Sequence, residues 1–188
     1  LIQKLARAAV RTNNIGSFHY LGRGTNYTKL SRANLPFSEL VETKRVYLIG
    51  ADITHDNAMV GEYVMENRRK NGLITEVITT KNTIPEDEKA DNVLHIKSYY
   101  HFVKAVNHYL LANHLENTDF IRNLIGNLNE YREQLIKEPW ESLLEEAGID
   151  DPETLIEFAL EYNQEKKAVI ILSEKELSGH TCAEIFNL

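Results

Sequence analysis

The feature that most constrains the fold of this chain is a short apolar run that stops at a glycine. Residues 46–49 are Val-Tyr-Leu-Ile, Gly50 follows them, and the polar turn after it carries two acids and a histidine. Continuous apolar character over so few residues is typical of a strand buried on both faces, as in a parallel sheet. Ligands of open α/β sheets bind at the carboxyl ends of such strands. The turn after Gly50 is therefore the first candidate binding site.

Strand-like and helix-like periods alternate along the chain after this point. Their order is strand, helix, strand, strand, then helices and one more strand. This order predicts an α/β fold with a Rossmann-like, doubly wound and mostly parallel sheet, to which a helical block has been added. The predicted elements are strands at 45–50, 74–78, 93–96 and 168–172, a helix at 58–71, and helices from about 99 to 163.

Several helix ends and buried stripes can be placed more closely. Gly72 is expected to end the first helix, because glycine favours the left-handed conformation found there. Pro139 and Gly148 are expected to begin and end a second helix, and Asp151 to cap a third. The predicted buried residues are Met59, Val60, Val64 and Met65 in the first helix, Trp140, Leu143, Leu144 and Ala147 in the second, and Leu155, Ile156, Ala159 and Leu160 in the third.

Composition narrows the class of protein. The 188 residues are 43% hydrophobic and 26% charged, as in an ordinary globular protein. The apolar run at 168–172 is far shorter than the ~20 residues of a spanning helix, so no direct membrane insertion is expected. The net charge of -7 argues against a nucleic-acid partner. The single cysteine, Cys182, excludes an internal disulfide and a cysteine-held iron–sulfur cluster within this sequence, and it fits a reducing compartment.

The two ends of the sequence differ from its middle. Residues 1–36 are predicted to form an N-terminal helix and a loop that belong to a neighbouring domain and pack partly outside the sheet. Residues 37–188 are predicted to form the α/β domain. The sequence starts inside an amphipathic pattern and stops inside a new helix that opens near His180, so we expect it to be a piece of a longer polypeptide.

The polar turn at 50–57 contains one glycine, whereas a nicotinamide cofactor normally needs the pattern G-x-G-x-x-G. An ordinary dehydrogenase is therefore not expected. A competing interpretation of the turn is that Thr54 or Asp56 only caps the next helix. The turn at 79–82 is expected to form the other side of the same crevice. The candidate cofactor-binding residues, expected to make a vestigial or weak site, are Gly50, Asp52, Thr54 and His55.

Histidine and cysteine patterns predict neither a metal site nor a catalytic centre. His101 and His108 are seven residues apart, which is too far for the i, i+4 chelation of zinc helices. His180 and Cys182 stand at a predicted helix start, where a thiolate is favoured, but no third partner is visible. Cys182 is therefore interpreted as a small core residue.

Several stretches resemble the molybdopterin oxidoreductase family, which includes formate dehydrogenases and the large iron–sulfur subunit of complex I. They follow the family patterns "G-T-N-N-[IV]-D", "V-L-x-I-G-x-[ND]-x-x-x-x-H-P" and "A-D-x-x-L-x-[IL]-K-x-G" in order and spacing, over nearly the whole chain. The matching stretches are LIQKLARAAVRTNNI, RVYLIGADITHDNAMVGEYVMENRRKNG, ADNVLHIKSYYHFVKAVNHYLLANHLENTDFI, residues 147–172 and GHTCAEIFNL.

The sequence departs from this family where the family binds its cofactor. Catalytic members carry a cysteine or selenocysteine shortly after T-N-N-[IV], but the stretch after Ile15, GSFHYLGRGTNY, has none. The family's "[DS]-P-R" turn, whose acid binds the guanine nucleotide, is replaced by Thr-Thr-Lys-Asn at 79–82, and Tyr99 stands in place of a glycine. The resemblance therefore implies a domain that has lost its cofactor contacts and kept its scaffold.

Such losses are expected of the large iron–sulfur subunit of an NADH–quinone oxidoreductase, in which this domain serves as architecture. The resemblance then implies a non-catalytic part of an oxidoreductase, with electron transfer from NADH to quinone performed by the whole complex. No cofactor is expected within these residues, and iron–sulfur clusters are expected elsewhere in the full-length chain. The implied partners are other subunits of a respiratory complex, and the implied location is cytoplasmic, with membrane association through that complex.

Two alternatives stay open at this point. The first is a domain of a divergent molybdopterin-dependent oxidoreductase, such as a formate dehydrogenase, whose cofactor survives without the cysteine. The second is a stand-alone nucleotide-binding module.

Overall fold

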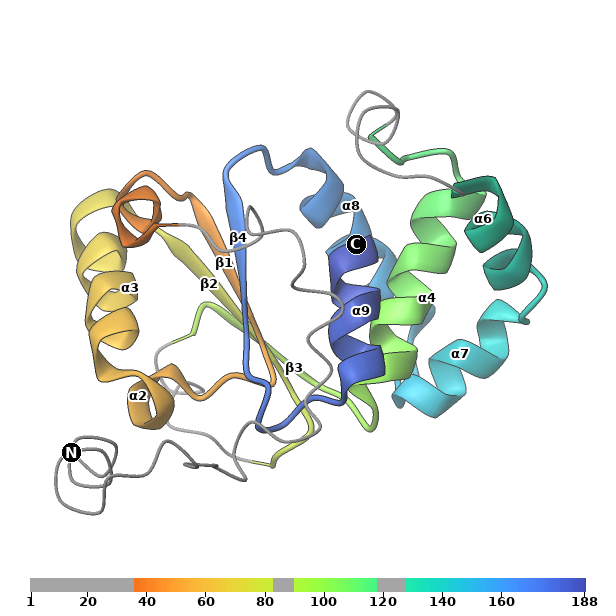
Figure 1. Ribbon diagram of the computed structural model, residues 1–188, viewed down its shortest axis with the longest axis horizontal. Coiled ribbons are helices and arrows are strands. Elements are labelled where there is room, and N and C mark those ends of the chain that lie inside the picture. The colour runs from red at the N-terminus through yellow and green to blue at the C-terminus, as the bar shows by residue number, and fades with distance from the viewer. Residues whose placement is uncertain (1–35, 83–89, 118–127) are drawn as a thin grey trace, which may run out of the picture.

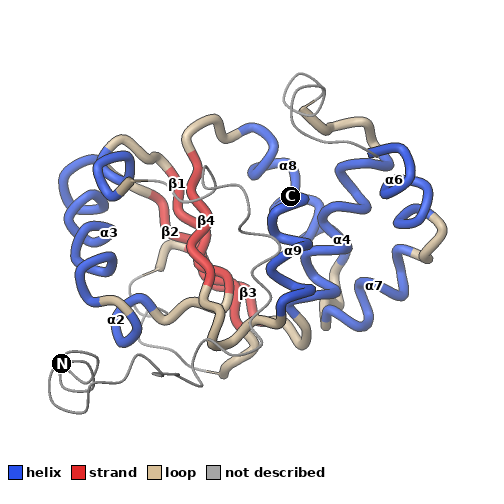
Figure 2. The backbone as a smooth tube through the Cα atoms, in the orientation of Figure 1, coloured by secondary structure: helices blue, strands red, loops and turns tan. Residues whose placement is uncertain are grey.

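The computed structural model describes residues 36–82, 90–117 and 128–188, so the predictions for residues 1–35 lie outside the described residues. The described strands form a four-stranded sheet with helices on both faces (Figures 1 and 2). All strand pairs are parallel, and the order across the sheet is β3-β2-β1-β4. The predicted α/β, Rossmann-like class is confirmed. The strands are β1 (Arg45–Ile49), β2 (Ile74–Thr79), β3 (Asn92–His95) and β4 (Ala168–Leu172).

The helices form two unequal layers, which Figure 1 shows on opposite sides of the sheet. The smaller layer consists of the short helix α2 (Ile53–Asp56) and α3 (Ala58–Asn71), with the 3-10 turn η3 (Phe37–Val41) beside α3. The larger layer is the helical block. Its described members are α4 (Tyr99–Ala112), α6 (Leu128–Ile136), α7 (Trp140–Ala147), α8 (Pro152–Gln164) and α9 (Gly179–Asn187).

The side chains of β1 point alternately to the two faces of the sheet, and each helical layer covers one of these faces. Val46 and Leu48 pack into the core on the α3 side, whereas Tyr47 and Ile49 pack into the core of the helical block. All four side chains are fully buried, with 0% exposure. Successive residues of a strand point to opposite faces, so a strand that is covered on both faces is apolar throughout.

Several predicted helix ends are confirmed. Gly72 and Gly148 follow α3 and α7 in the left-handed conformation, with φ values of 67° and 79°. Asp151 caps α8, because its carboxylate accepts a hydrogen bond from the backbone N–H of Glu153 at 3.1 Å. The helix boundaries therefore follow from local backbone chemistry that the sequence shows directly.

The predicted buried stripe of α3 is partly wrong. Met59 is 65% exposed and Met65 is only half-buried. The physical reason is that α2 packs against the start of α3, where a β-carbon on Gly61 would lie 3.3 Å from the carbonyl oxygen of Ile53. The buried face of α3 is therefore turned away from the methionines. It consists of Val60, Gly61, Val64 and Asn67.

The predicted stripe of α8 also needs a correction, because Phe158 is buried whereas Ile156 and Leu160 are half-buried. Phe158 packs edge-on against Tyr47 and Phe102, with ring centroids 5.3 Å and 5.1 Å apart. Such aromatic pairs turn the buried face of a helix toward the aromatic residue.

The lengths of the described helices also bear on the membrane question. None of them combines the length and the apolar character that a bilayer-crossing helix requires.

Candidate functional site

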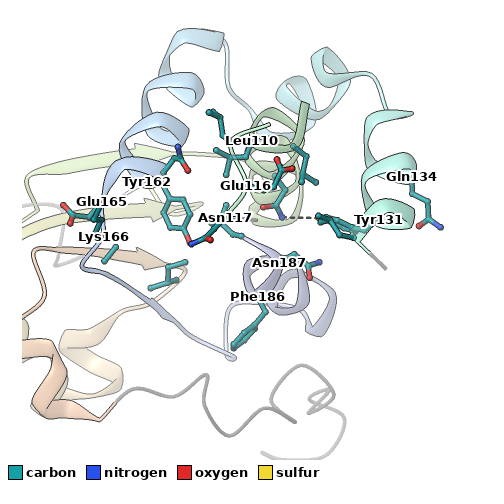
Figure 3. A pocket seen from close by; sticks show the side chains of 18 of the residues that line it. Leu110, Glu116, Asn117, Tyr131, Gln134, Tyr162, Glu165, Lys166, Phe186 and Asn187 are labelled. Atoms are coloured by element: carbon teal, nitrogen blue, oxygen red, sulfur yellow. Dashed lines mark hydrogen bonds between the residues drawn. The ribbon is translucent and has the colours of Figure 1, made fainter. Parts of the chain in front are cut away.

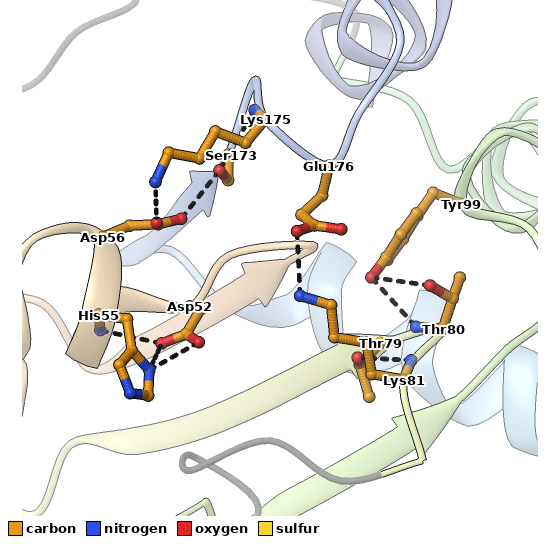
Figure 4. A network of polar contacts seen from close by, with 10 residues as sticks. All are labelled: Asp52, His55, Asp56, Thr79, Thr80, Lys81, Tyr99, Ser173, Lys175 and Glu176. Carbon is orange, nitrogen blue, oxygen red and sulfur yellow. Dashed lines mark hydrogen bonds and ion pairs between the residues drawn. The ribbon is translucent and has the colours of Figure 1, made fainter.

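Two hollows among the described residues bear on a possible function. The larger one, which we call the groove, has a cavity volume of about 570 Å³ and lies among α4, α6, α8, α9 and the amino-terminal half of β4 (Figure 3). The smaller one, the crevice, lies at the carboxyl ends of β1 and β2 and encloses about 10 Å³ (Figure 4), room for roughly one water molecule. The crevice occupies the place where open α/β sheets bind ligands. It is lined by Gly50, Asp52, Thr79, Lys81, Tyr99 and Glu176, among others.

The turn after β1 satisfies its polar groups internally. Gly50 has a positive φ of 58°, and its N–H donates to the carbonyl of Ile78 at 3.1 Å. The carboxylate of Asp52 accepts a hydrogen bond from the backbone N–H of His55 at 3.0 Å and pairs with Nδ1 of the same residue at 2.9 Å. An anionic ligand favours a helix N-terminus, but at α2 the protein's own carboxylate takes that position.

The helix-capping interpretation of this turn applies, but to other residues. The caps are Asp52 for α2 and Asn57 for α3, and not Thr54 or Asp56. Asn57 Oδ1 accepts from the backbone N–H of Val60 at 3.3 Å. The sequence does not reveal the four-residue helix α2, and this helix moves the start of the main helix beyond Asp56.

The turn after β2 also leaves few donors for a ligand. The backbone N–H of Thr80 donates to the hydroxyl of Tyr99 at 3.0 Å, and the N–H of Lys81 donates to Oγ1 of Thr79 at 3.1 Å. Backbone N–H groups in such turns can cradle phosphates. In this turn both N–H groups already have partners within the protein.

Charged side chains bridge the crevice from the loop after β4, as Figure 4 shows. The Lys81 ammonium binds the carboxylate of Glu176 at 3.0 Å, and this hydrogen bond raises the pKa of Lys81. Nearby, Lys175 pairs with Asp56, and the hydroxyl of Ser173 donates to the same carboxylate at 3.2 Å. Both cations are therefore neutralised by acids of the chain itself.

The crevice does not fit a pterin or nicotinamide dinucleotide. A β-carbon on Gly50 would lie 2.8 Å from Cδ2 of Leu177 and 3.2 Å from Cζ of Tyr99, so these side chains fill the space beside the glycine. Pockets for ligands of drug size usually have volumes of ~300–1,000 Å³, far above the 10 Å³ of the crevice. The turn at 79–82 adds no carboxylate that could bind a guanine.

The structure brings only some of the predicted site residues together. Gly50 and Asp52 line the crevice, whereas Thr54 and His55 are exposed on α2 and do not belong to its lining. Sequence reasoning missed Lys81 and Glu176 as a pair. The available signal was positional, since Lys81 follows β2 and Glu176 follows β4, the two strands that flank β1 in the parallel sheet.

The histidines of α4 have local partners. His101 contacts Glu146 at 2.6 Å, and burial lowers the pKa of His108. Among the described residues, no group of three or more histidine, cysteine or acidic side chains is placed to hold a metal. Cys182 is buried in the core of the helical block, as interpreted from the sequence.

Comparisons with known proteins identify a shared fold. No protein-family model matches the chain, and a search of curated proteins found no significant match. Among solved structures, acetylene hydratase from Pelobacter acetylenicus is similar with a TM-score of 0.60 and 16% identity. The similarity covers 85% of this chain but 23% of that enzyme. An identity this low shows a shared fold and nothing about function.

Proposed function

We propose that this chain is a non-catalytic scaffold domain from the large iron–sulfur subunit of an NADH–quinone oxidoreductase. The observation that carries the proposal is the closed crevice. Its turns are capped by Asp52 and Tyr99, and its charges are paired across it by Lys81 and Glu176. A domain of this fold that kept a cofactor would need that space and those donors free.

The finer assignment rests on the pattern of departures from the molybdopterin oxidoreductases. The family's ligand cysteine after Ile15 and the acid of the turn at 79–82 are missing, while the sheet and its two helical layers are kept. Retention of a fold without its cofactor contacts is expected where the fold holds other parts of an assembly in place. In this proposal, the iron–sulfur clusters lie elsewhere in the full-length chain, and other subunits of a membrane-associated respiratory complex are the partners.

One observation favours a second candidate, a divergent enzyme that still binds a nucleotide cofactor. Asp52 lines the crevice and carries a carboxylate, the group that recognises guanine N–H donors. Losing the partner of such a buried polar group costs ~1–3 kcal/mol. At ~1.4 kcal/mol per tenfold, this corresponds to roughly one to two decades in affinity, so the two candidates predict different binding.

Calorimetric titration of the chain with GDP, molybdopterin guanine dinucleotide and NADH distinguishes the scaffold proposal from the nucleotide-binding candidate. The scaffold proposal predicts no saturable binding of any of the three. The matched variants are Asp52→Ala and Asp151→Ala, since each removes an aspartate that caps a helix but only Asp52 lines the crevice. Micromolar binding that is lost in Asp52→Ala and kept in Asp151→Ala would establish the second candidate instead.

The assignment to a respiratory complex has a test of its own. The full-length protein, purified from its source, is expected to show electron paramagnetic resonance signals of several iron–sulfur clusters and to copurify with an NADH-oxidising subunit. Purification of a full-length protein with neither feature would rule out this assignment while leaving the closed crevice unexplained.

A further inference from the structure

The walls of the groove combine apolar and polar side chains. The apolar ones include Leu110, Leu111 and Ile170, and Phe186 at the edge of the groove is 40% exposed. β4 forms one side, and it is the last strand of the sheet within the described residues, where it pairs only with β1. All five residues of β4 are only partly buried. An open apolar surface beside an unpaired strand edge is typical of a place where another segment packs.

Two polar side chains that line the groove, Asn107 and Tyr131, are engaged with each other and with Glu184. The buried amide of Asn107 donates to the hydroxyl of Tyr131 at 3.2 Å and to the carbonyl of Glu184 at 3.1 Å. The Tyr131 hydroxyl in turn donates to the carboxylate of Glu184 at 2.6 Å. A specific small-molecule site needs a few convergent polar groups that are free to orient the ligand. A protein segment, which binds mainly through apolar contact, suits this groove better.

The rim of the groove carries negative charge. Glu116 pairs with Arg132, but its Oε2 is buried and has no hydrogen-bond partner within the described residues. Glu130 and Glu165 also line the groove, and Lys166 is the cation that lines it. The helices around the rim are strongly acidic, since residues 128–165 contain twelve acidic residues and two basic ones. An occupant with basic side chains would find its counter-charges here.

The first 35 residues of the chain have the opposite charge. They contain six basic residues and no acidic one, although the whole chain has a net charge of -7. Their apolar residues Leu1, Ile2 and Leu5 recur at helical spacing, while Lys4, Arg7 and Arg11 fall beside this apolar stripe. The sequence of this segment therefore combines an apolar pattern with basic residues.

The described chain also passes close to the groove soon after this segment ends. The backbone N–H of Lys44 donates to the carbonyl of Lys167 at 2.9 Å, and the ammonium of Lys167 lies 3.8 Å from the carboxylate of Glu42. Its neighbours in sequence, Lys166 and Ala168, line the groove. A chain spans up to ~3.3–3.6 Å per extended residue, so the segment is long enough to reach the groove.

We propose that residues 1–35 dock in the groove, with their apolar stripe against Leu110, Leu111 and Ile170 and their basic side chains against the acidic rim. This docking is an interaction of the chain with itself and does not depend on the assignment to a respiratory complex. It also specifies where the neighbouring-domain segment expected from the sequence meets the α/β domain.

Carbodiimide cross-linking of the full chain tests the proposal, because this reagent joins amines only to carboxylates that they contact. Lys4 and Lys29 are the lysines of the segment. We expect them to be linked to Glu116, Glu130 or Glu165, as read by mass spectrometry of proteolytic peptides. An equal mixture of ¹⁴N- and ¹⁵N-labelled protein should give links within one chain, without mixed-isotope pairs.

Two pairs of variants separate docking from general charge attraction. The double variant Glu130→Gln/Glu165→Gln should lower the yield of these links at least severalfold. The control double variant Glu141→Gln/Glu145→Gln changes the charge equally, but on α7 and outside the groove lining, and it should leave the yield unchanged. Leu5→Asp, on the apolar stripe, should abolish the links, and Gln3→Asp, off the stripe, should leave most of them.

Three results would overturn the proposal. Mixed-isotope links would show that the groove is occupied by a second copy of the chain. Links directed mainly to Glu62 or Glu66 of α3 would place the segment on the opposite face of the sheet. The absence of any link from Lys4 and Lys29 to the groove carboxylates would show that the segment does not dock there.

Discussion

The crevice and the groove lie at opposite ends of the same sheet and are built in opposite ways. The crevice is small, and ion pairs and hydrogen bonds from three loops satisfy one another across it. The groove is much larger, combines apolar and polar side chains in its walls, and leaves room for an occupant. The position where this fold class binds ligands is thus filled by the chain itself, and the open surface lies where a protein segment can pack. This difference is the structural basis of the scaffold role proposed above.

The largest expected effect is a difference in unfolding free energy between a variant at the crevice and a variant at the groove. Leu177→Ala should lower the free energy of unfolding by ~2–5 kcal/mol, the cost of truncating a buried leucine, since Leu177 is buried against Gly50 and Tyr99. Leu115→Ala, at the half-buried wall of the groove, should cost clearly less. Urea unfolding of both variants measures the difference. Equal costs would mean that the groove is packed as tightly as the crevice.

A second prediction distinguishes two costs of adding a side chain at Gly50: the strain of a positive φ and the clash with residues that fill the crevice. Gly50→Ala and Gly72→Ala both place a side chain at a positive φ, which costs roughly 1–2 kcal/mol. At Gly72 nothing lies within 4 Å of the added carbon, whereas at Gly50 it meets Leu177 at 2.8 Å. Gly50→Ala should therefore lose a further ~1–3 kcal/mol, typical of overpacking, as measured by chemical denaturation. Equal losses would show that the crevice can yield and accept a ligand.

A third prediction concerns the polar contacts that join the walls of the groove. Asn107→Ala removes the amide that links α4 to Tyr131 and to the carbonyl of Glu184. The cost should be ~0.5–1.5 kcal/mol, the net worth of typical hydrogen bonds, because water in the open groove can reach the freed partners. Hydrogen exchange should show faster opening of α9, with α3 unchanged as an internal control. A loss well above this range would mean that the groove excludes water.

The smallest expected effect is a pH dependence at the crevice. The pKa of Lys81 is raised above its usual 10.5 by Glu176, so the folded state holds this proton more strongly than the unfolded state. The resulting stability is fully present below pH 10.5 and is lost as the pH rises through the raised pKa. The unfolding free energy of wild type relative to Lys81→Ala should fall across this range. A constant difference would mean that the Lys81–Glu176 pair contributes nothing to the closed crevice.

Most of the fold could be predicted from the sequence, because its signals are local. The apolar run at 46–49 and the glycines at 72 and 148 specify a buried strand and two helix ends without reference to distant residues. The errors at Met59 and Phe158 have a different origin. Which side of a helix is buried depends on its neighbours, here α2 and the rings of Tyr47 and Phe102.

The candidate site could be located from the sequence, but its chemistry could not be predicted. The rule about strand ends led to Gly50 and Asp52, both of which line the crevice. The bond between Lys81 and Glu176 joins residues 95 positions apart, and no local pattern announces such a pair. The sequence predicted a vestigial or weak site, and only the three-dimensional arrangement shows which side chains pair across it.

The order of the strands has a consequence for the way in which the chain folds. β1 and β2 are joined by the helices α2 and α3. β1 also pairs with β4, where Arg45 lies opposite Ala168, and the whole helical segment between β3 and β4 separates these strands in the sequence. Pairing between distant residues must overcome the entropy of closing a long loop, and such topologies fold slowly. We expect β1, α3 and β2 to assemble early and β4 to join late. Refolding should then show α3 protected from hydrogen exchange before β4 is.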